Sequence, residues 1–212
     1  MGPNQDKLFL EVAGRPVVAH TWRRFDQAKE IDEIIMVVRE GMEGAFKELA
    51  AQCGLKKPFR LVAGGAERQD SVWNGLQAAN PASQIVCIQD GARPCTSFEI
   101  ISETIHAAKE MGAAVAARPV TDTIKESADG RLVERTVDRA KLWAVQTPQT
   151  FRVEVIRDSI SMARARGLHL TDDTAACELA GHPIRLVTGA APNPKVTVPD
   201  DLAYVELLLK RE

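Results

Sequence analysis

Short apolar runs alternate with longer stretches of helical periodicity along this chain, and this alternation limits the possible folds more than any other feature. The apolar runs are rich in β-branched residues and lie at 33–38, 60–62, 85–88, 113–116 and 184–187. The first run is nearly continuous in apolar residues, which is typical of a strand covered on both faces. Strands that alternate with helices favour a mostly parallel sheet with right-handed crossovers.

Seven segments with helical periodicity separate or follow these runs. They lie at about 16–28, 42–53, 68–79, 97–111, 153–166, 172–180 and 199–210. At 212 residues the chain is long enough for one domain with a sizeable core, and it contains neither an internal repeat nor a low-complexity linker. The predicted fold is therefore α/β: a Rossmann-like, mostly parallel sheet flanked by helices, in a single domain over 1–212.

One segment, from about 120 to 151, interrupts the alternation because it contains no good amphipathic helix. It has a turn at Asp129-Gly130 between two stretches with strand character, which is a hairpin signature. An isolated hairpin is only marginally stable in water, so it needs a surface to pack against. We therefore predict a protruding β-arm over about 120–151 that packs against a partner subunit to form a homodimer. The alternative is a hairpin folded back on its own domain.

The charge and the cysteines exclude several classes of protein. The 27 basic and 29 acidic side chains give a net charge of −2, which argues against a nucleic-acid binder but leaves room for local phosphate sites. No apolar run reaches the length of a membrane span, and no signal-peptide pattern follows Met1. The four cysteines are scattered, and the four histidines lack metal-ligand spacing. We expect a reduced, cytoplasmic protein that supplies no metal ligands, with no membrane partner.

Ligands of an open parallel sheet bind beyond the carboxyl ends of its strands. After the run at 60–62 the chain continues as Gly64-Gly65-Ala66-Glu67-Arg68-Gln69-Asp70-Ser71, a glycine turn that leads into a helix. The glycines allow a ligand to approach the backbone closely, and the start of the helix offers free N–H groups. A Gly-Gly pair by itself, however, is more often only a tight turn.

Asp90-Gly91-Ala92-Arg93-Pro94 follows the run at 85–88. The carboxylate can take a metal ion or a ribose hydroxyl, and the arginine can take a phosphate bidentately. A surface Asp–Arg pair that only stabilises the turn explains the same residues equally well.

Three more basic residues, Lys7, Arg139 and Lys195, lie among apolar or turn residues. Each of them, taken singly, is also compatible with an ordinary solvated side chain. The sequence contains no GxGxxG, GxxxxGK[ST], nucleophile elbow or HExxH motif, which disfavours dehydrogenases, P-loop proteins, hydrolases and zinc proteases.

Six segments of the sequence are informative because of the order in which they occur along the chain. They are Gly64-Gly65-Ala66-Glu67-Arg68-Gln69-Asp70-Ser71-Val72, Asp90-Gly91-Ala92-Arg93-Pro94, Thr136-Val137-Asp138-Arg139, Thr147-Pro148-Gln149, Leu170-Thr171-Asp172-Asp173 and Lys195-Val196-Thr197. Together they resemble the 2-C-methyl-D-erythritol 4-phosphate cytidylyltransferase family over essentially the whole chain. The resemblance implies a nucleotide-diphospho-sugar transferase-like fold. It also implies a CTP-dependent enzyme of non-mevalonate isoprenoid biosynthesis that joins CTP to methylerythritol phosphate and releases pyrophosphate.

The resemblance further implies roles for individual residues. Lys7 and Lys195 would surround the reacting phosphates, and Arg139 would position the substrate phosphate from the partner subunit's arm. The nucleotide-binding residues would be Gly64, Gly65, Ala66, Arg68, Ser71, Asp90 and Gly91. The substrate-binding residues would be Arg93, Thr123, Thr147 and Thr171. Mg²⁺ would be bound mainly through the phosphates of CTP.

These residue types suit the implied reaction. Its nucleophile is a phosphate monoester, which is largely dianionic at neutral pH because its second pKa is about 6. No general base is needed. The reaction requires positive charge around the α-phosphate and in-line placement of the attacking and leaving groups. Lysines, arginines and Mg²⁺ meet that need.

The sequence departs from the family pattern in two places. Family members begin with a buried strand and a glycine-rich loop that carries an arginine, whereas this sequence opens at 1–7 with what resembles only the end of that loop. We therefore expect the first strand and that arginine to be missing, and turnover to be low. Ala66 also stands where the family often has an acidic residue. Two alternatives remain: a cytidylyltransferase for another polyol phosphate such as ribitol 5-phosphate, and a truncated, non-catalytic module for nucleotide binding or dimerisation.

Overall fold

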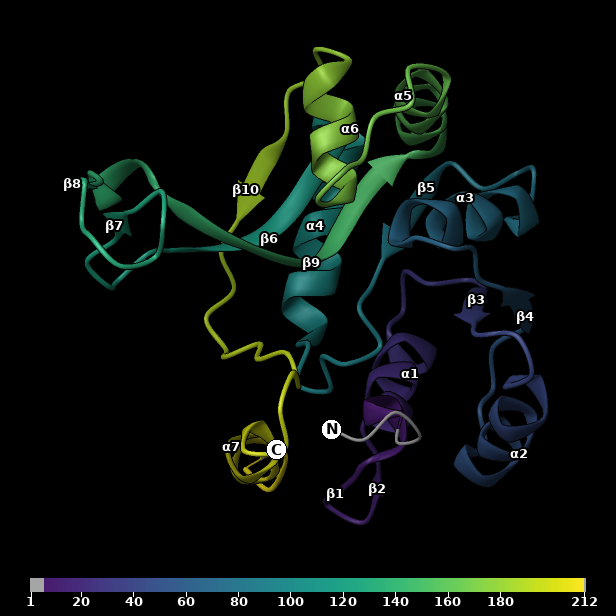
Figure 1. Cartoon of the computed structure of the whole chain (residues 1–212). Coiled ribbons are helices and arrows are strands. Elements are labelled where there is room, and N and C mark those ends of the chain that lie inside the picture. Colours follow the sequence, from purple (N-terminus) through teal and green to yellow (C-terminus); the bar gives the residue numbers. More distant parts are fainter. Residues whose placement is uncertain (1–5, 212) are drawn as a thin grey trace.

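A four-stranded sheet forms the centre of the computed structural model, which describes residues 6–211 (Figure 1). Its strands lie in the order β10 (Arg185–Val187), β6 (Ala113–Pro119), β9 (Trp143–Arg152) and β5 (Ile85–Ile88). Strands β5 and β6 both run antiparallel to β9, and β10 runs parallel to β6, so three of the four strands share a direction. The prediction of an α/β fold with a mostly parallel sheet is confirmed.

Two further strands, β3 (Ile34–Val38) and β4 (Phe59–Ala63), form a parallel pair in which Ile34 lies opposite Phe59. Two short antiparallel hairpins, β1 (Glu11–Val12) with β2 (Arg15–Pro16) and β7 (Lys125–Glu126) with β8 (Arg135–Thr136), complete the strands of the described residues. The hairpin β1–β2 has no counterpart among the strands that the sequence predicts.

The helices lie close to the seven predicted segments. They are α1 (Val17–Gln27), α2 (Glu43–Cys53), α3 (Arg68–Ala78), α4 (Phe98–Met111), α5 (Val153–Ala165), α6 (Asp173–Leu179) and α7 (Asp201–Leu209), with 3-10 helices η1 (Lys7–Phe9) and η2 (Arg139–Lys141). The boundaries follow local chemistry. Helix α4, for example, begins at Ser97, whose hydroxyl accepts the N–H of Ile100, and ends at Gly112, whose φ of 93° suits a residue without a side chain.

The core is built where the helices cover the strands. Helix α4 turns a fully buried face, including Ile101 and Ala108, toward the sheet. Phe151 of β9 packs with Ile156 and Ile160 of α5 in a second buried cluster. The burial of apolar side chains in such clusters is the main source of stability in an α/β domain.

The β7–β8 hairpin protrudes from the main sheet, as predicted for the β-arm (Figure 1). Its turn contains Gly130 at a φ of +70°. The predicted arm over 120–151 is longer than the protruding part, because residues from 143 onward form β9 and pair with β5 and β6 inside the sheet. Sequence periodicity missed β9, whose core residues include the polar Thr147, Gln149 and Thr150. The prediction for the opening segment concerns residues 1–7, of which 1–5 lie outside the described residues.

The core of α4 provides a test of this packing. Ile101→Ala should lower the free energy of unfolding by about 2–5 kcal/mol, because Ile101 is fully buried and its loss leaves a cavity. Met111→Ala on the same helix should cost about 1 kcal/mol or less, because Met111 is 44% exposed. Chemical denaturation of the two variants measures the difference, and equal losses would contradict this packing of α4.

Candidate active site

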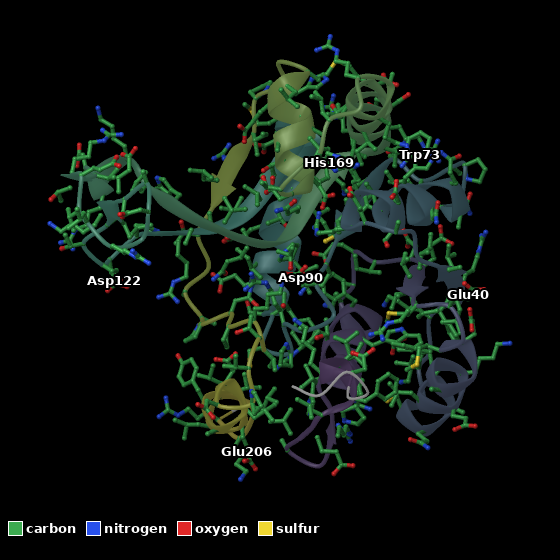
Figure 2. The ribbon with its side chains drawn as sticks, viewed as in Figure 1. Glu40, Trp73, Asp90, Asp122, His169 and Glu206 are labelled. Atoms are coloured by element: carbon green, nitrogen blue, oxygen red, sulfur yellow. The ribbon has the colours of Figure 1, made fainter. Side chains whose placement is uncertain are left out.

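Charged residues from several chain segments meet where strands β4 and β5 end. Asp90 follows β5, the glycine turn follows β4, and Lys195 lies in the segment between β10 and α7. Figure 2 shows Asp90 near the middle of the molecule, below the central sheet. This edge of the sheet is where ligands of open α/β folds bind.

Asp90 is the centre of this cluster. Its Oδ2 lies 3.0 Å from Nζ of Lys195 and 3.3 Å from Nε of Arg93. The backbone N–H of Asp90 donates to the hydroxyl of Thr147, at 3.1 Å, in the neighbouring strand β9. The structure therefore brings together four residues that the sequence predicted for the site.

The charge state of Asp90 follows from these neighbours. Burial by itself raises the pKa of this carboxyl, but the hydrogen bond and charge of Lys195, with the charges of Arg93 and Arg68, outweigh burial and lower it. Asp90 is therefore an anion at neutral pH. It holds the cationic ends of Lys195 and Arg93 within hydrogen-bonding distance of one atom.

Asn193 supports this cluster, although it was not among the predicted site residues. Its backbone carbonyl accepts from Nη1 of Arg93 at 2.8 Å, and its Nδ2 donates to the carbonyl of Thr147 at 2.8 Å. Its Oδ1 also accepts from the hydroxyl of Thr96. Asn193 is buried, so these bonds fasten the segment that carries Lys195 to the sheet. The only sequence signal was its place two residues before Lys195.

The glycine turn is organised by Ser71 and the start of α3. The hydroxyl of Ser71 accepts from the N–H of Gly65 and donates to the carbonyl of Glu67, both at 3.1 Å. A Cβ added to Gly65 would lie 2.2 Å from Cβ of Asp70, so the turn itself requires glycine there. Gly64 is tightly placed too, since its Cβ would lie 3.0 Å from the Ser71 hydroxyl. Ala66 is exposed within this turn.

Arg68 joins this turn to helix α6. Its Nη2 lies 2.6 Å from Oδ2 of Asp173, a carboxylate that is only 2% exposed. Burial lowers the pKa of Arg68, but the hydrogen bond and charge of Asp173, with the charges of Asp90 and Asp172, outweigh burial and raise it. Arg68 thus remains a cation whose charge also acts on Asp90.

Gln149 links the same region to the central sheet. Its Nε2 donates to Oδ2 of Asp172 at 2.8 Å, and its Oε1 accepts from the N–H of Asp173 at 3.0 Å. Asp172 also caps α6 by accepting from the N–H of Ala175. The anchoring roles of Gln149 and Asp173 were not predicted from the sequence. Thr171 is exposed immediately before this cap.

Three predicted residues, Lys7, Arg139 and Thr123, belong neither to the Asp90 cluster nor to the glycine turn. Lys7 lies in η1, whose next residue, Leu8, packs close to Gly91, so its segment borders the site. Arg139 and Thr123 lie in the arm, where Arg139 donates to the carbonyl of Thr121. The labelled Asp122 marks the arm, which is well separated from Asp90 (Figure 2).

The donor set at this site does not form a cage for a metal ion. Within residues 6–211, no group of three or more His, Cys, Asp or Glu side chains is arranged to bind one. The central carboxylate, Asp90, already bonds two cations. Separately, none of the helices in this range is both long and apolar enough to cross a membrane.

Comparison with known proteins decides the family. The family model described as 2-C-methyl-D-erythritol 4-phosphate cytidylyltransferase (IspD) matches residues 1–211. The chain belongs to this family. The enzyme of that name from Alkaliphilus oremlandii is 42% identical over 211 residues, which cover 99% of this chain and 89% of the relative.

Solved structures agree with this assignment. The 4-diphosphocytidyl-2C-methyl-D-erythritol synthase of Anaerococcus prevotii has a TM-score of 0.88 at 32% identity, covering 96% of this chain and 93% of that one. The 2-C-methyl-D-erythritol 4-phosphate cytidylyltransferase of Thermus thermophilus has a TM-score of 0.82 at 35% identity, covering 96% and 94%. The nucleotidyltransferase-like fold that the resemblance implied is thereby confirmed.

The charge balance around Asp90 is open to measurement. Lys195→Met should raise the pKa of Asp90. It removes the strongest interaction that lowers this pKa, so the opposite effect of burial becomes larger in proportion. Carboxyl NMR titration measures this pKa. Lys210→Met is the matched control, since Lys210 pairs with Glu206 on the surface of α7. An unchanged Asp90 pKa in Lys195→Met would show that Arg93 and Arg68 alone set the charge.

Proposed function

We infer that this chain transfers the cytidylyl group of CTP to 2-C-methyl-D-erythritol 4-phosphate. The products are 4-diphosphocytidyl-2-C-methyl-D-erythritol and pyrophosphate, and the reaction belongs to non-mevalonate isoprenoid biosynthesis. The observation that carries this inference is the convergence of Lys195, Arg93 and Arg68 around Asp90, at the edge of the sheet where ligands bind. The match of the whole chain to the cytidylyltransferase family supports the same conclusion.

The chemistry of the step assigns work to these cations. An oxygen of the substrate phosphate forms a bond to the α-phosphorus of CTP while the bond to the β-phosphate bridging oxygen breaks, and pyrophosphate leaves. Negative charge grows on the five-coordinate phosphorus during this exchange. Lys195 stabilises that charge, as does Lys7 from the bordering η1 segment, and Arg93 with Thr147 and Thr171 holds the substrate phosphate. Asp90 keeps Lys195 and Arg93 in place until the phosphates arrive.

The glycine turn provides the other half of the site. Gly64, Gly65 and Ala66 present backbone groups to the cytosine, and Ser71 and Arg68 hold the turn in shape. Recognition through backbone N–H and C=O groups discriminates among bases, because a wrong base leaves buried polar groups unpaired. Gly91, beside Asp90, allows the ribose to approach the backbone.

Mg²⁺ is the cofactor in this proposal and is bound through the phosphates of CTP. Support comes from the donor set, which offers cations and one engaged carboxylate rather than a cage of oxygens. When bound, the ion neutralises charge on the triphosphate. A cytoplasmic location is in keeping with four free cysteines, which suit a reducing compartment.

A homodimer formed through the β-arm completes the proposal. Leu132 and Val133 of the arm are 74% and 62% exposed, and an apolar pair of this kind is stabilised by docking against a twofold copy. Arg139 and Thr123 belong to the same arm, which is well separated from the Asp90 of its own chain (Figure 2). The arm would therefore deliver Arg139 and Thr123 to the partner's site.

Pyrophosphate release tests the reaction and its substrate. The protein should release pyrophosphate from CTP with 2-C-methyl-D-erythritol 4-phosphate and much more slowly with ribitol 5-phosphate. Lys195→Ala should lower kcat by a factor of about 10² with folding intact, whereas Lys210→Ala should leave kcat unchanged. Equal rates with the two polyol phosphates would contradict the substrate assignment, and a near-normal kcat in Lys195→Ala would contradict the role of Lys195.

Mixed dimers test whether Arg139 acts across the interface. Arg139→Ala and Lys195→Ala should each be nearly inactive. In a dimer of one chain of each kind, one site has both defects and the other has neither if Arg139 acts in trans. Activity should therefore return in part when the two variants are mixed. Without recovery, and with subunit exchange confirmed by an independent label, Arg139 must act within its own chain.

A further inference from the structure

A pocket lies apart from the candidate active site. It has a volume of about 270 Å³ and is lined by Ala13, Arg15, His20, Arg23, Arg24, Gln27 and Leu209. These residues belong to the β1–β2 hairpin, to α1 and to the end of α7, which lie together below the central sheet in Figure 1. None of them belongs to the cytidylyl-transfer site described above.

The lining of this pocket is strongly basic. Arg15, His20, Arg23 and Arg24 all face it, and none of the described residues that line it is acidic. Helical spacing explains the arrangement, because positions 20, 23, 24 and 27 share one face of α1. Three of the four are arginines, and such a concentration of positive charge is unusual in a chain whose net charge is −2.

Local contacts hold these side chains in place. Nε2 of His20 donates to the carbonyl of Val12 at 2.8 Å, because a carbonyl can only accept. Nη1 of Arg23 donates to the carbonyl of Cys53 at 3.1 Å, and the guanidinium of Arg24 lies 5.4 Å from the ring centre of Phe98. Side chains that are already positioned lose less entropy when a ligand binds.

The pKa of His20 responds mainly to burial and to a smaller extent to the arginines around it. Burial lowers the pKa of this imidazole, and the charges of Arg15, Arg24 and Arg23 lower it further, while the hydrogen bond to Val12 only partly opposes them. Arg15 and Arg23 place positive charge in the space next to His20. An anion in the pocket would neutralise part of this charge, and the forked donors of arginine match phosphate oxygens.

We propose that this basic pocket, formed by Arg15, His20, Arg23 and Arg24, is a binding site for a small anion that carries a phosphate or pyrophosphate group, separate from the catalytic site. The volume of about 270 Å³ lies just below the range of small-molecule pockets and accommodates a phosphorylated metabolite or inorganic pyrophosphate. The proposal does not depend on the identity of the substrate at the Asp90 site.

Two histidines make it possible to observe the two sites separately. His20 lines the basic pocket, whereas Nδ1 of His169 lies 3.0 Å from Glu67 beside the glycine turn (Figure 2). NMR of the imidazole resonances, assigned with His20→Gln and His169→Gln, follows each ring during titration. The titrants are inorganic phosphate, inorganic pyrophosphate and CTP, with sodium chloride at matched ionic strength as the control for screening.

Pyrophosphate should shift the His20 resonances in a saturable way with a Kd below about 1 mM, and sodium chloride should not. Phosphate should act at the same ring more weakly, because it has fewer charged oxygens. The double variant Arg15→Gln/Arg23→Gln should weaken the effect at His20 at least about tenfold, since it removes two charge-assisted contacts. Arg166→Gln, which removes an exposed arginine at the end of α5, should not change it.

The proposal is overturned if His20 does not respond to pyrophosphate, or if the double variant binds as tightly as the parent. A response to a poly-glutamate peptide but not to either inorganic anion would also overturn it, because the site would then bind an acidic protein segment. CTP that shifts His169 while pyrophosphate leaves His20 unmoved would contradict only this proposal. A pyrophosphate response at His20 without any cytidylyl transfer would instead contradict only the proposed function.

Discussion

The ion pairs of Asp90 join parts of the chain that are more than a hundred residues apart. Its carboxylate bonds both Lys195 and Arg93, and its backbone N–H donates to Thr147. These contacts connect the end of β5, the middle of β9 and the segment before α7. An anion among several cations is stable while half-buried because each desolvated charge has an opposite neighbour. Asp90, Lys195 and Arg93 together leave one positive charge unbalanced, and a phosphoryl-transfer site requires positive charge.

A second network of hydrogen bonds and ion pairs positions the glycine turn and the start of α3. Gln149 bonds both Asp172 and Asp173, and Asp173 in turn pairs with Arg68 at the start of α3. Because Asp173 is almost fully buried, losing Arg68 would leave a carboxylate without a partner. The glycine turn is thus held from two sides, by Ser71 within its own helix and by α6 through Arg68.

The arm and the basic pocket are different in kind from this rigid edge. The β7–β8 hairpin exposes Leu132 and Val133, so it gains stability mainly by contact with another surface. The pocket beside α1 is lined by three arginines, and the proposed anion would neutralise part of their charge. Helix α1 also borders the catalytic edge, because the hydroxyl of Thr21 donates to the carbonyl of Gly91. One helix therefore contacts both the Asp90 loop and the basic pocket.

The sequence by itself determined the helices, the strands β3 to β6 and β10, the hairpin turn at Asp129-Gly130 and the family, because apolar periodicity, turn residues and ordered motifs are local signals. Only the tertiary structure showed that 143–152 is a sheet strand, since its polar residues are buried by partners distant in sequence. It also decided that Asn193, Gln149 and Asp173 anchor the site and that four basic side chains meet beside α1. Hydrogen bonds and ion pairs between distant segments produce no periodic pattern in the sequence, so they cannot be predicted from it in the way that strands and helices can.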